Sequence, residues 1–197
     1  MDYKILSYLL FYPDEEYLAN LKSLKENLNT EVENSNLRAD VSDFIDKITT
    51  IDKYEAQSNY VAYFDSNPSL SLYLFDNVWG DSKERGQALV DLKELYEKHN
   101  FVIDNTKQLP DFIPLFLEFL SVINESEAKE LLSETYELMN TLYLRHKKID
   151  SIYSVVFKNL IKKMDKEITE TDVKVLNAKE IDELWQEQEV VFSNKVN

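Results

Sequence analysis

Glycine, proline and cysteine are scarce or absent in this chain. Among its 197 residues there are two glycines, four prolines and no cysteine. Sandwiches and barrels need many tight turns, which draw on Gly and Pro for their dihedral angles. A phosphate-binding loop of the Rossmann or P-loop type needs several glycines close together. The composition therefore argues against all-β folds and Gly-rich nucleotide sites.

The absence of cysteine excludes disulfides, a thiol nucleophile and Cys-ligated zinc or iron–sulfur clusters. It favours a reducing compartment. No cationic segment precedes the first apolar run, so no signal peptide is predicted. The most hydrophobic stretch, residues 112–123, contains Glu118 and is too short to cross a bilayer. These features predict a soluble cytoplasmic protein.

Acidic residues outnumber basic ones. The chain has 37 Asp and Glu against 22 Lys and Arg, for a formal net charge of −15. Nucleic acid and anionic lipid are bound through basic patches, so we expect no nucleic-acid partner and no direct membrane insertion. An acidic surface suits a basic partner, although such charge commonly serves solubility alone.

Apolar residues recur at helical spacing along almost the whole chain, and strand-like alternation is absent. The pattern predicts an all-α bundle of roughly seven or eight helices, with one domain over residues 1–164 and a weakly ordered tail over 165–197. The clearest helix is expected over residues 124–148. Asp14 and Ser82 are predicted N-caps. A further helix is expected from Pro110 to about Val122, with Asp111 best placed to cap its start.

Residue patterns typical of catalysis or metal binding are weak. Neither of the two histidines, His99 and His146, lies three residues after a Glu, as di-iron helical bundles require. A stripe of glutamates on the predicted helix over residues 124–148 is typical of a solvated helix face. We therefore predict no catalytic residue, no metal site and no enzymatic activity.

Two segments combine aromatic residues with embedded charges. Residues 60–88 and 109–120 contain both glycines and three of the four prolines. Charges beside large apolar surface must be paired, capped or offered to a ligand. We therefore expect a carboxylate-rimmed aromatic groove for a basic amphipathic peptide, between the helix after Ser82 and the helix containing Leu117. The candidate contacts are Tyr60, Phe64, Asp65, Tyr73, Asp76, Arg85, Gln87, Asp111, Leu117, Glu118 and Phe119.

The same segments resemble the NarJ-type chaperones, also called the delta subunit of respiratory nitrate reductase, within the wider group of TorD-like chaperones. The most specific blocks are Arg-Gly-Gln at residues 85–87 and Leu-Pro-Asp at 109–111. Tyr-Pro-Asp at 12–14 and Trp185 near the C-terminus are also similar to the family pattern. Departures include Gln108 where Glu is usual and Asp76-Asn77 in place of Glu-His.

The resemblance implies an all-α assembly chaperone that binds the apo catalytic (alpha) subunit of nitrate reductase, including its N-terminal peptide. The client, rather than the chaperone, would receive the bis-molybdopterin guanine dinucleotide cofactor, before docking on its membrane partner. Monomer and homodimer both remain open. Two alternatives are a chaperone for another molybdoenzyme of the superfamily and an all-α nucleotide pyrophosphohydrolase. The latter needs paired Glu-x-x-Glu and Glu-x-x-Asp motifs on separate helices, and these are not evident.

Overall fold

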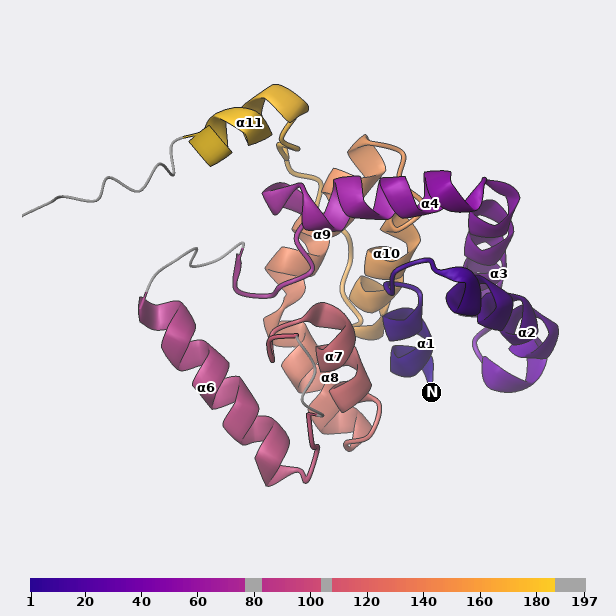
Figure 1. Cartoon of the computed structure of the whole chain (residues 1–197). Coiled ribbons are helices and arrows are strands. Elements are labelled where there is room, and N and C mark those ends of the chain that lie inside the picture. Colours follow the sequence, from indigo (N-terminus) through magenta and orange to yellow (C-terminus); the bar gives the residue numbers. More distant parts are fainter. Residues whose placement is uncertain (77–82, 104–107, 187–197) are drawn as a thin grey trace, which may run out of the picture.

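The computed structural model describes residues 1–76, 83–103 and 108–186, and this part of the chain is a bundle of ten α-helices without a strand (Figure 1). The all-α prediction is confirmed, with slightly more helices than the seven or eight expected. The helices are α1 (Asp2–Tyr8), α2 (Glu15–Glu31), α3 (Ser35–Thr50), α4 (Lys53–Tyr60), α6 (Lys83–Lys98), α7 (Ile113–Leu120), α8 (Glu125–Glu134), α9 (Tyr136–Lys148), α10 (Ser154–Lys163) and α11 (Ala178–Gln186). A π-helical turn, Val61–Asp65, and a 3₁₀ turn, Pro68–Leu70, follow α4.

The helix expected over residues 124–148 is in fact two helices. It breaks at Thr135, whose φ and ψ are −90° and 6°. The Thr135 hydroxyl donates to the Leu132 carbonyl at 2.7 Å, which is the kind of local side-chain bond that competes with helical hydrogen bonding. Leu132 before the break and Met139 after it are both fully buried. Because the apolar stripe continues across the break, helical spacing alone could not predict that one helix ends at Thr135 and another begins.

The structure confirms one predicted helix start and corrects another. Asp14 caps α2 as predicted, since its carboxylate accepts a hydrogen bond of 2.8 Å from the Tyr17 N–H. Helix α7 begins at Ile113 rather than Pro110, with Phe112 as its N-cap and Pro114 in its first turn, where proline is tolerated. The prediction that Asp111 caps this helix is wrong. Ser82 lies outside the described residues.

The core lies where α1, α7, α9 and α10 meet. Helix α1 packs along α7 and α10 packs along α9, while α2 and α3 form a hairpin at one side (Figure 1). Helix α7 is almost wholly apolar, and six of its eight residues are buried, as expected for a helix surrounded by others. A buried hydrogen bond of 2.8 Å from the Ser7 hydroxyl to the Pro114 carbonyl joins α1 to α7.

Residues after α10 continue along the bundle. The Asn140 amide of α9 donates to the Thr169 carbonyl at 2.8 Å and accepts from the Thr169 N–H at 3.1 Å. Further on, the Leu176 N–H donates to the Ser69 hydroxyl at 3.2 Å. Residues 165–176 therefore form a strap across α9 that leads into α11. The weaker order of the tail over 165–197 stays a prediction, and residues 187–197 lie outside the described part.

In the described ranges, no helix is both long and apolar enough to span a membrane.

Candidate peptide-binding groove

The two segments that stand out in the sequence lie side by side in the structure. Tyr73 and Phe112 form an isolated antiparallel bridge. The Leu74 N–H donates to the Asp111 carbonyl at 2.9 Å, and the Ile113 N–H donates to the Leu72 carbonyl at 2.8 Å. Backbone pairing thus holds the loop of residues 71–76 against the residues that lead into α7.

Asp111 fixes this loop from the inside. Its side chain is fully buried, and its carboxylate accepts a hydrogen bond of 3.2 Å from the Phe75 N–H. Burial raises the pKa of the Asp111 carboxyl, while the Phe75 N–H and the positive charge of Arg85 oppose that rise. Its other oxygen, Oδ1, has no hydrogen-bond partner among the described residues. Asp111 therefore positions the loop and is not a solvent-facing contact.

An ion pair joins the same loop to the start of α6. Arg85 lies 2.6 Å from Asp76, and the Ser71 hydroxyl donates to the second Asp76 oxygen, also at 2.6 Å. Both charged side chains are partly buried, with 21% and 29% exposed. Charge-assisted bonds of this length are stronger than neutral ones, so they fix where α6 begins relative to the loop.

Tyr96 anchors the other half of α6. Among the α6 side chains that the structure describes, only Tyr96 is fully buried, and it packs against Phe101 and Phe119. Its hydroxyl donates to the Pro110 carbonyl at 2.8 Å. Helix α6 is therefore held at two points, at Arg85 and at Tyr96, along the edge of the bundle (Figure 1).

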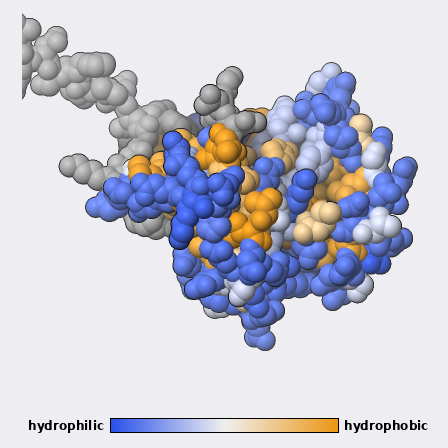
Figure 2. All heavy atoms as spheres, turned by 90° about the horizontal axis from the view of Figure 1, so that it is seen from below, coloured by the Kyte–Doolittle hydropathy of each residue, from blue (hydrophilic) through white to orange (hydrophobic). Residues whose placement is uncertain are grey.

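Between these anchors lies an apolar groove of about 290 Å³, which we call the α6 groove. Seen from below, the surface shows apolar patches bordered by hydrophilic side chains (Figure 2). The α6 groove is lined by Leu74, Phe75, Ala88, Leu92, Leu95, Phe116 and Leu131, with Asp91, Glu134 and Thr135 as its polar members. Such a groove can hold the apolar face of a peptide helix, with the carboxylates at its rim selecting cationic residues.

The sequence of this chain matches a known protein family. The sequence model of the nitrate reductase delta subunit family matches residues 16–150. The chain belongs to this family. The matched region contains every residue of the α6 groove and every predicted contact.

Named relatives and a solved structure agree with the assignment to the delta subunit family. The nitrate reductase molybdenum cofactor assembly chaperone NarJ of Escherichia coli K12 is 34% identical, over 95% of this chain and 83% of its own length. A Bacillus subtilis protein named as a probable chaperone of the same kind is 31% identical over 81% of this chain and 85% of its own. The crystal structure of a redox enzyme maturation protein from Archaeoglobus fulgidus has the same fold, with a TM-score of 0.60 at 24% identity, covering 83% of this chain and 92% of that one.

Four of the predicted contacts, Tyr73, Asp76, Arg85 and Asp111, come together where the loop of residues 71–76 meets the start of α6. None of them is among the residues that line the α6 groove. The Tyr73 hydroxyl donates to the side-chain oxygen of Gln108 at 2.6 Å. Gln108 therefore accepts a hydrogen bond at the position where the family pattern usually has Glu. Gln87 is exposed on α6 and donates to Asp91 at 2.7 Å.

Other predicted contacts lie in the interior. Leu117 and Phe119 have no exposed surface. Tyr60 and Phe64 are buried and pack edge-to-face against Tyr153. The expectation that these four side chains line a groove is therefore corrected, because in this structure they are packed in the hydrophobic core. They are large apolar residues at helical spacing, and that pattern is shared by core and groove positions.

The remaining two acids point elsewhere. Asp65 is exposed at the end of the π-helical turn. Glu118 is half-buried on the side of α7 that faces α1, in a second groove with Lys4 and Ile5. Burial raises the pKa of Glu118, and the positive charge of Lys4 opposes it. Glu118 therefore belongs to a different surface from Asp76.

Sequence reasoning missed Leu92, Leu95 and Leu131, which line the α6 groove. Ala88, Leu92 and Leu95 are spaced by four and three residues, a signal that was available for one face of α6. Leu131 comes from α8, and nothing in the local sequence says that it meets α6. A link between these helices is visible at their far end, where His99 is hydrogen-bonded to Glu127 at 3.0 Å.

Within residues 1–76, 83–103 and 108–186, no group of three or more His, Cys, Asp or Glu side chains is arranged to hold a metal ion.

Proposed function

We propose that this protein is an assembly chaperone of respiratory nitrate reductase, acting in the cytoplasm and without enzymatic activity. It binds the apo catalytic subunit, including the N-terminal segment of that subunit, before the subunit reaches the membrane. The client receives the bis-molybdopterin guanine dinucleotide cofactor, and this chain holds none itself. Family membership and the names of relatives such as E. coli NarJ support the class of function.

The α6 groove is the observation that supports peptide binding. It is apolar along its floor, open to solvent, and built from the same blocks that the family match covers. Apolar contacts along Leu92, Leu95 and Leu131 would supply most of the affinity. The rim carboxylates Asp91 and Glu134 would favour basic residues of the client segment, and their influence should weaken as salt rises.

Calorimetry with a synthetic peptide of the client's N-terminal segment tests the groove. Replacing Leu92 by Asp places a charge on the apolar floor and should weaken binding by at least about tenfold, a loss of about 1.4 kcal/mol. Val90→Asp is the matched control, because Val90 is on the same helix, 49% exposed and outside the groove. Equal affinities for the two variants, both with helical circular dichroism spectra, would contradict the α6 groove as the binding site.

Copurification from the native host tests the identity of the client. The large subunit that remains attached to the tagged chaperone is identified by its mass. We expect the catalytic subunit of nitrate reductase. Recovery of a different molybdoenzyme subunit would contradict the proposed client and would leave the chaperone class standing.

A further inference from the structure

The strap, residues 165–176, lies along α9 and leads to α11 (Figure 1). Beyond its first residue it forms neither helix nor strand, and most of its side chains are exposed. Side chains of α9 hold its backbone instead. The Tyr136 hydroxyl donates to the Glu167 carbonyl at 2.9 Å, and the Asn140 amide bonds both backbone groups of Thr169. An extended segment that buries little apolar surface can open while the bundle stays folded.

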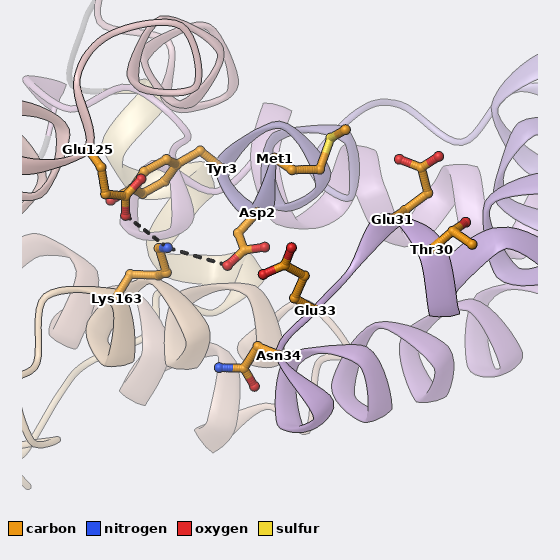
Figure 3. Close-up of a pocket in the computed structure, with 9 residues that line it drawn as sticks. All are labelled: Met1, Asp2, Tyr3, Thr30, Glu31, Glu33, Asn34, Glu125 and Lys163. Carbon is orange, nitrogen blue, oxygen red and sulfur yellow. Dashed lines mark hydrogen bonds and ion pairs between the residues drawn. The ribbon is translucent and has the colours of Figure 1, made fainter.

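The start of the strap is fixed by charged groups. Lys163, the last residue of α10, lies 3.3 Å from Asp2 of α1 and 3.1 Å from Glu125 of α8. Figure 3 shows these three side chains together at one side of a cleft of about 730 Å³. Asp165 follows with a φ of 52°, a left-handed conformation common just after a helix, and is ion-paired with Lys129 of α8. Opening of the strap therefore begins at its far end.

The far end of the strap is bound to the 3₁₀ turn Pro68–Leu70. The Asn67 amide donates to the Leu176 carbonyl at 3.0 Å, and the Leu176 N–H donates to the Ser69 hydroxyl at 3.2 Å. Asn67 and Ser69 are both buried and are joined by a hydrogen bond of 2.6 Å. Arg145 of α9 holds the same turn, since its guanidinium donates to the Ser69 carbonyl at 2.6 Å. The strap thus supplies partners to two polar side chains that the fold buries.

The same turn leads directly into the wall of the α6 groove. The loop of residues 71–76 follows it, and two side chains of this loop, Leu74 and Phe75, line the groove. Leu70 and Leu72, which lie between the turn and these two residues, are buried. No glycine lies in this segment, so its backbone has little freedom to bend between the two contacts. A displacement of the turn is therefore carried to the groove wall.

We propose that the strap regulates the α6 groove. With the strap docked, the turn and the loop of residues 71–76 are held in the conformation that forms the groove wall. Release of the far end of the strap lowers the affinity of the groove for its peptide. Because coupling between two sites is reciprocal, a peptide in the groove also keeps the strap docked. The regulation of peptide binding rests on the proposed function, whereas the coupling of strap and loop is a property of this chain alone.

Amide hydrogen exchange measures this coupling without a client. The double variant Tyr136→Phe, Asn140→Ala keeps an aromatic ring at position 136 and removes the hydrogen bonds from α9 to the strap. The reporter is the Leu74 amide, which donates to the Asp111 carbonyl at 2.9 Å. Its exchange, measured relative to the amides of α8, should become about three- to tenfold faster in the double variant.

The matched control is Tyr17→Phe, Asn159→Ala, which changes the same two residue types elsewhere in the bundle. It removes a hydroxyl bond to the Leu9 carbonyl and amide bonds to Asp40 and Val155, none of which involves the strap. The relative exchange of the reporter amide should change by less than about twofold in this control. An equal acceleration in the control would indicate general destabilisation and would overturn the inference.

Leu176→Pro tests the coupling from the side of the strap. Proline has no N–H, so the bond to the Ser69 hydroxyl is lost while every side chain of the bundle stays in place. The Leu74 amide should exchange faster in this variant as well. Unchanged exchange of that amide in Leu176→Pro would overturn the inference, and this result does not depend on how well the double variant folds.

Calorimetry with the client's N-terminal peptide measures the regulation. Tyr136→Phe, Asn140→Ala should raise the Kd about three- to tenfold, and the matched control should raise it less than about twofold. The peptide should also slow proteolysis of residues 165–176 in the wild-type protein. Faster exchange with an unchanged Kd would overturn the regulation and leave the proposed function standing. A wild-type protein that binds no peptide would overturn the proposed function and the regulation together, and the exchange rates would still decide the coupling.

Discussion

Replacement of Asp111 tests how the site is assembled. In Asp111→Ala the loop of residues 71–76 loses its interior acceptor, because the Phe75 N–H donates to this carboxylate at 3.2 Å. In Asp111→Asn an amide oxygen remains in place to accept the same bond. The two variants therefore separate the hydrogen bond from the charge.

The expected loss follows from the burial of the group. Leaving the Phe75 N–H without a partner should cost about 2 kcal/mol of unfolding free energy, within a usual range of about 1–3 kcal/mol, and should lower the melting temperature by about 4–8 °C in a chain of this size. Asp111→Asn should cost less than about 1 kcal/mol, because the acceptor is kept and the lost attraction to Arg85 is offset by burying a neutral group.

The charge of Asp111 gives a pH signature. Because burial raises its pKa, the folded protein holds the proton more tightly than the unfolded chain does. The contribution of Asp111 to the unfolding free energy is then largest in acid and falls as pH rises through the window between the two pKa values. Asp111→Asn lacks this loss, so its stability relative to wild type should improve as the pH is raised from about 4.

Urea denaturation of the three proteins across that pH range measures both effects, and calorimetry with the client's N-terminal peptide measures the consequence for binding. Asp111→Asn should keep most of the affinity and Asp111→Ala should lose it, because Asp111 acts through the loop. Equal stabilities for Asn and Ala would refute the positioning role. A normal peptide affinity in folded Asp111→Ala would refute it too.

Three further outcomes are expected. Burial lowers the pKa of His146 to about 3 from 6.5. Only the unfolded chain therefore takes up a proton at this residue between those values, and each pH unit of acidification there should cost about 1.4 kcal/mol of unfolding free energy. His146→Phe should remove that loss in urea titrations at stepped pH. Tyr96→Phe should cost about 1 kcal/mol and speed amide exchange in α6 more than in α10, since it frees the Pro110 carbonyl; uniform exchange would contradict the anchor. Asn140→Ala removes two hydrogen bonds to Thr169 and should speed proteolysis of residues 165–176 without changing the melting of the bundle; an unchanged cleavage rate would show that the strap is held by other contacts.

Local patterns were enough for the class of fold and for several details of it. Helical spacing predicted the all-α architecture, and the Asp14 cap of α2 was readable because a cap depends on residues within one turn. The break at Thr135 was missed, since a single non-helical residue leaves the apolar stripe continuous. The start of α7 was misplaced because both Pro110 and Pro114 are compatible with a first turn.

The candidate site was predictable in outline only. The sequence marked the two segments that meet at the Tyr73–Phe112 bridge, because charged residues stand out within aromatic runs. It could not say which of those residues face solvent. Leu117 is buried and Glu118 faces α1, although they are adjacent in the chain, because neighbouring helical residues point about 100° apart and α7 is enclosed on most sides.

Composition, helical period and short motifs by themselves determined that this chain is an acidic, cysteine-free helical bundle with the blocks of the nitrate reductase delta subunit family. These are properties of residues close together in the sequence. Only the tertiary structure decided that Asp111 is an interior anchor and that Leu92 and Leu131 share a groove. It also decided that Glu31, at the end of α2, lies across one cleft from Lys163. Burial and charge compensation depend on which helices meet, and that information is spread over the whole chain.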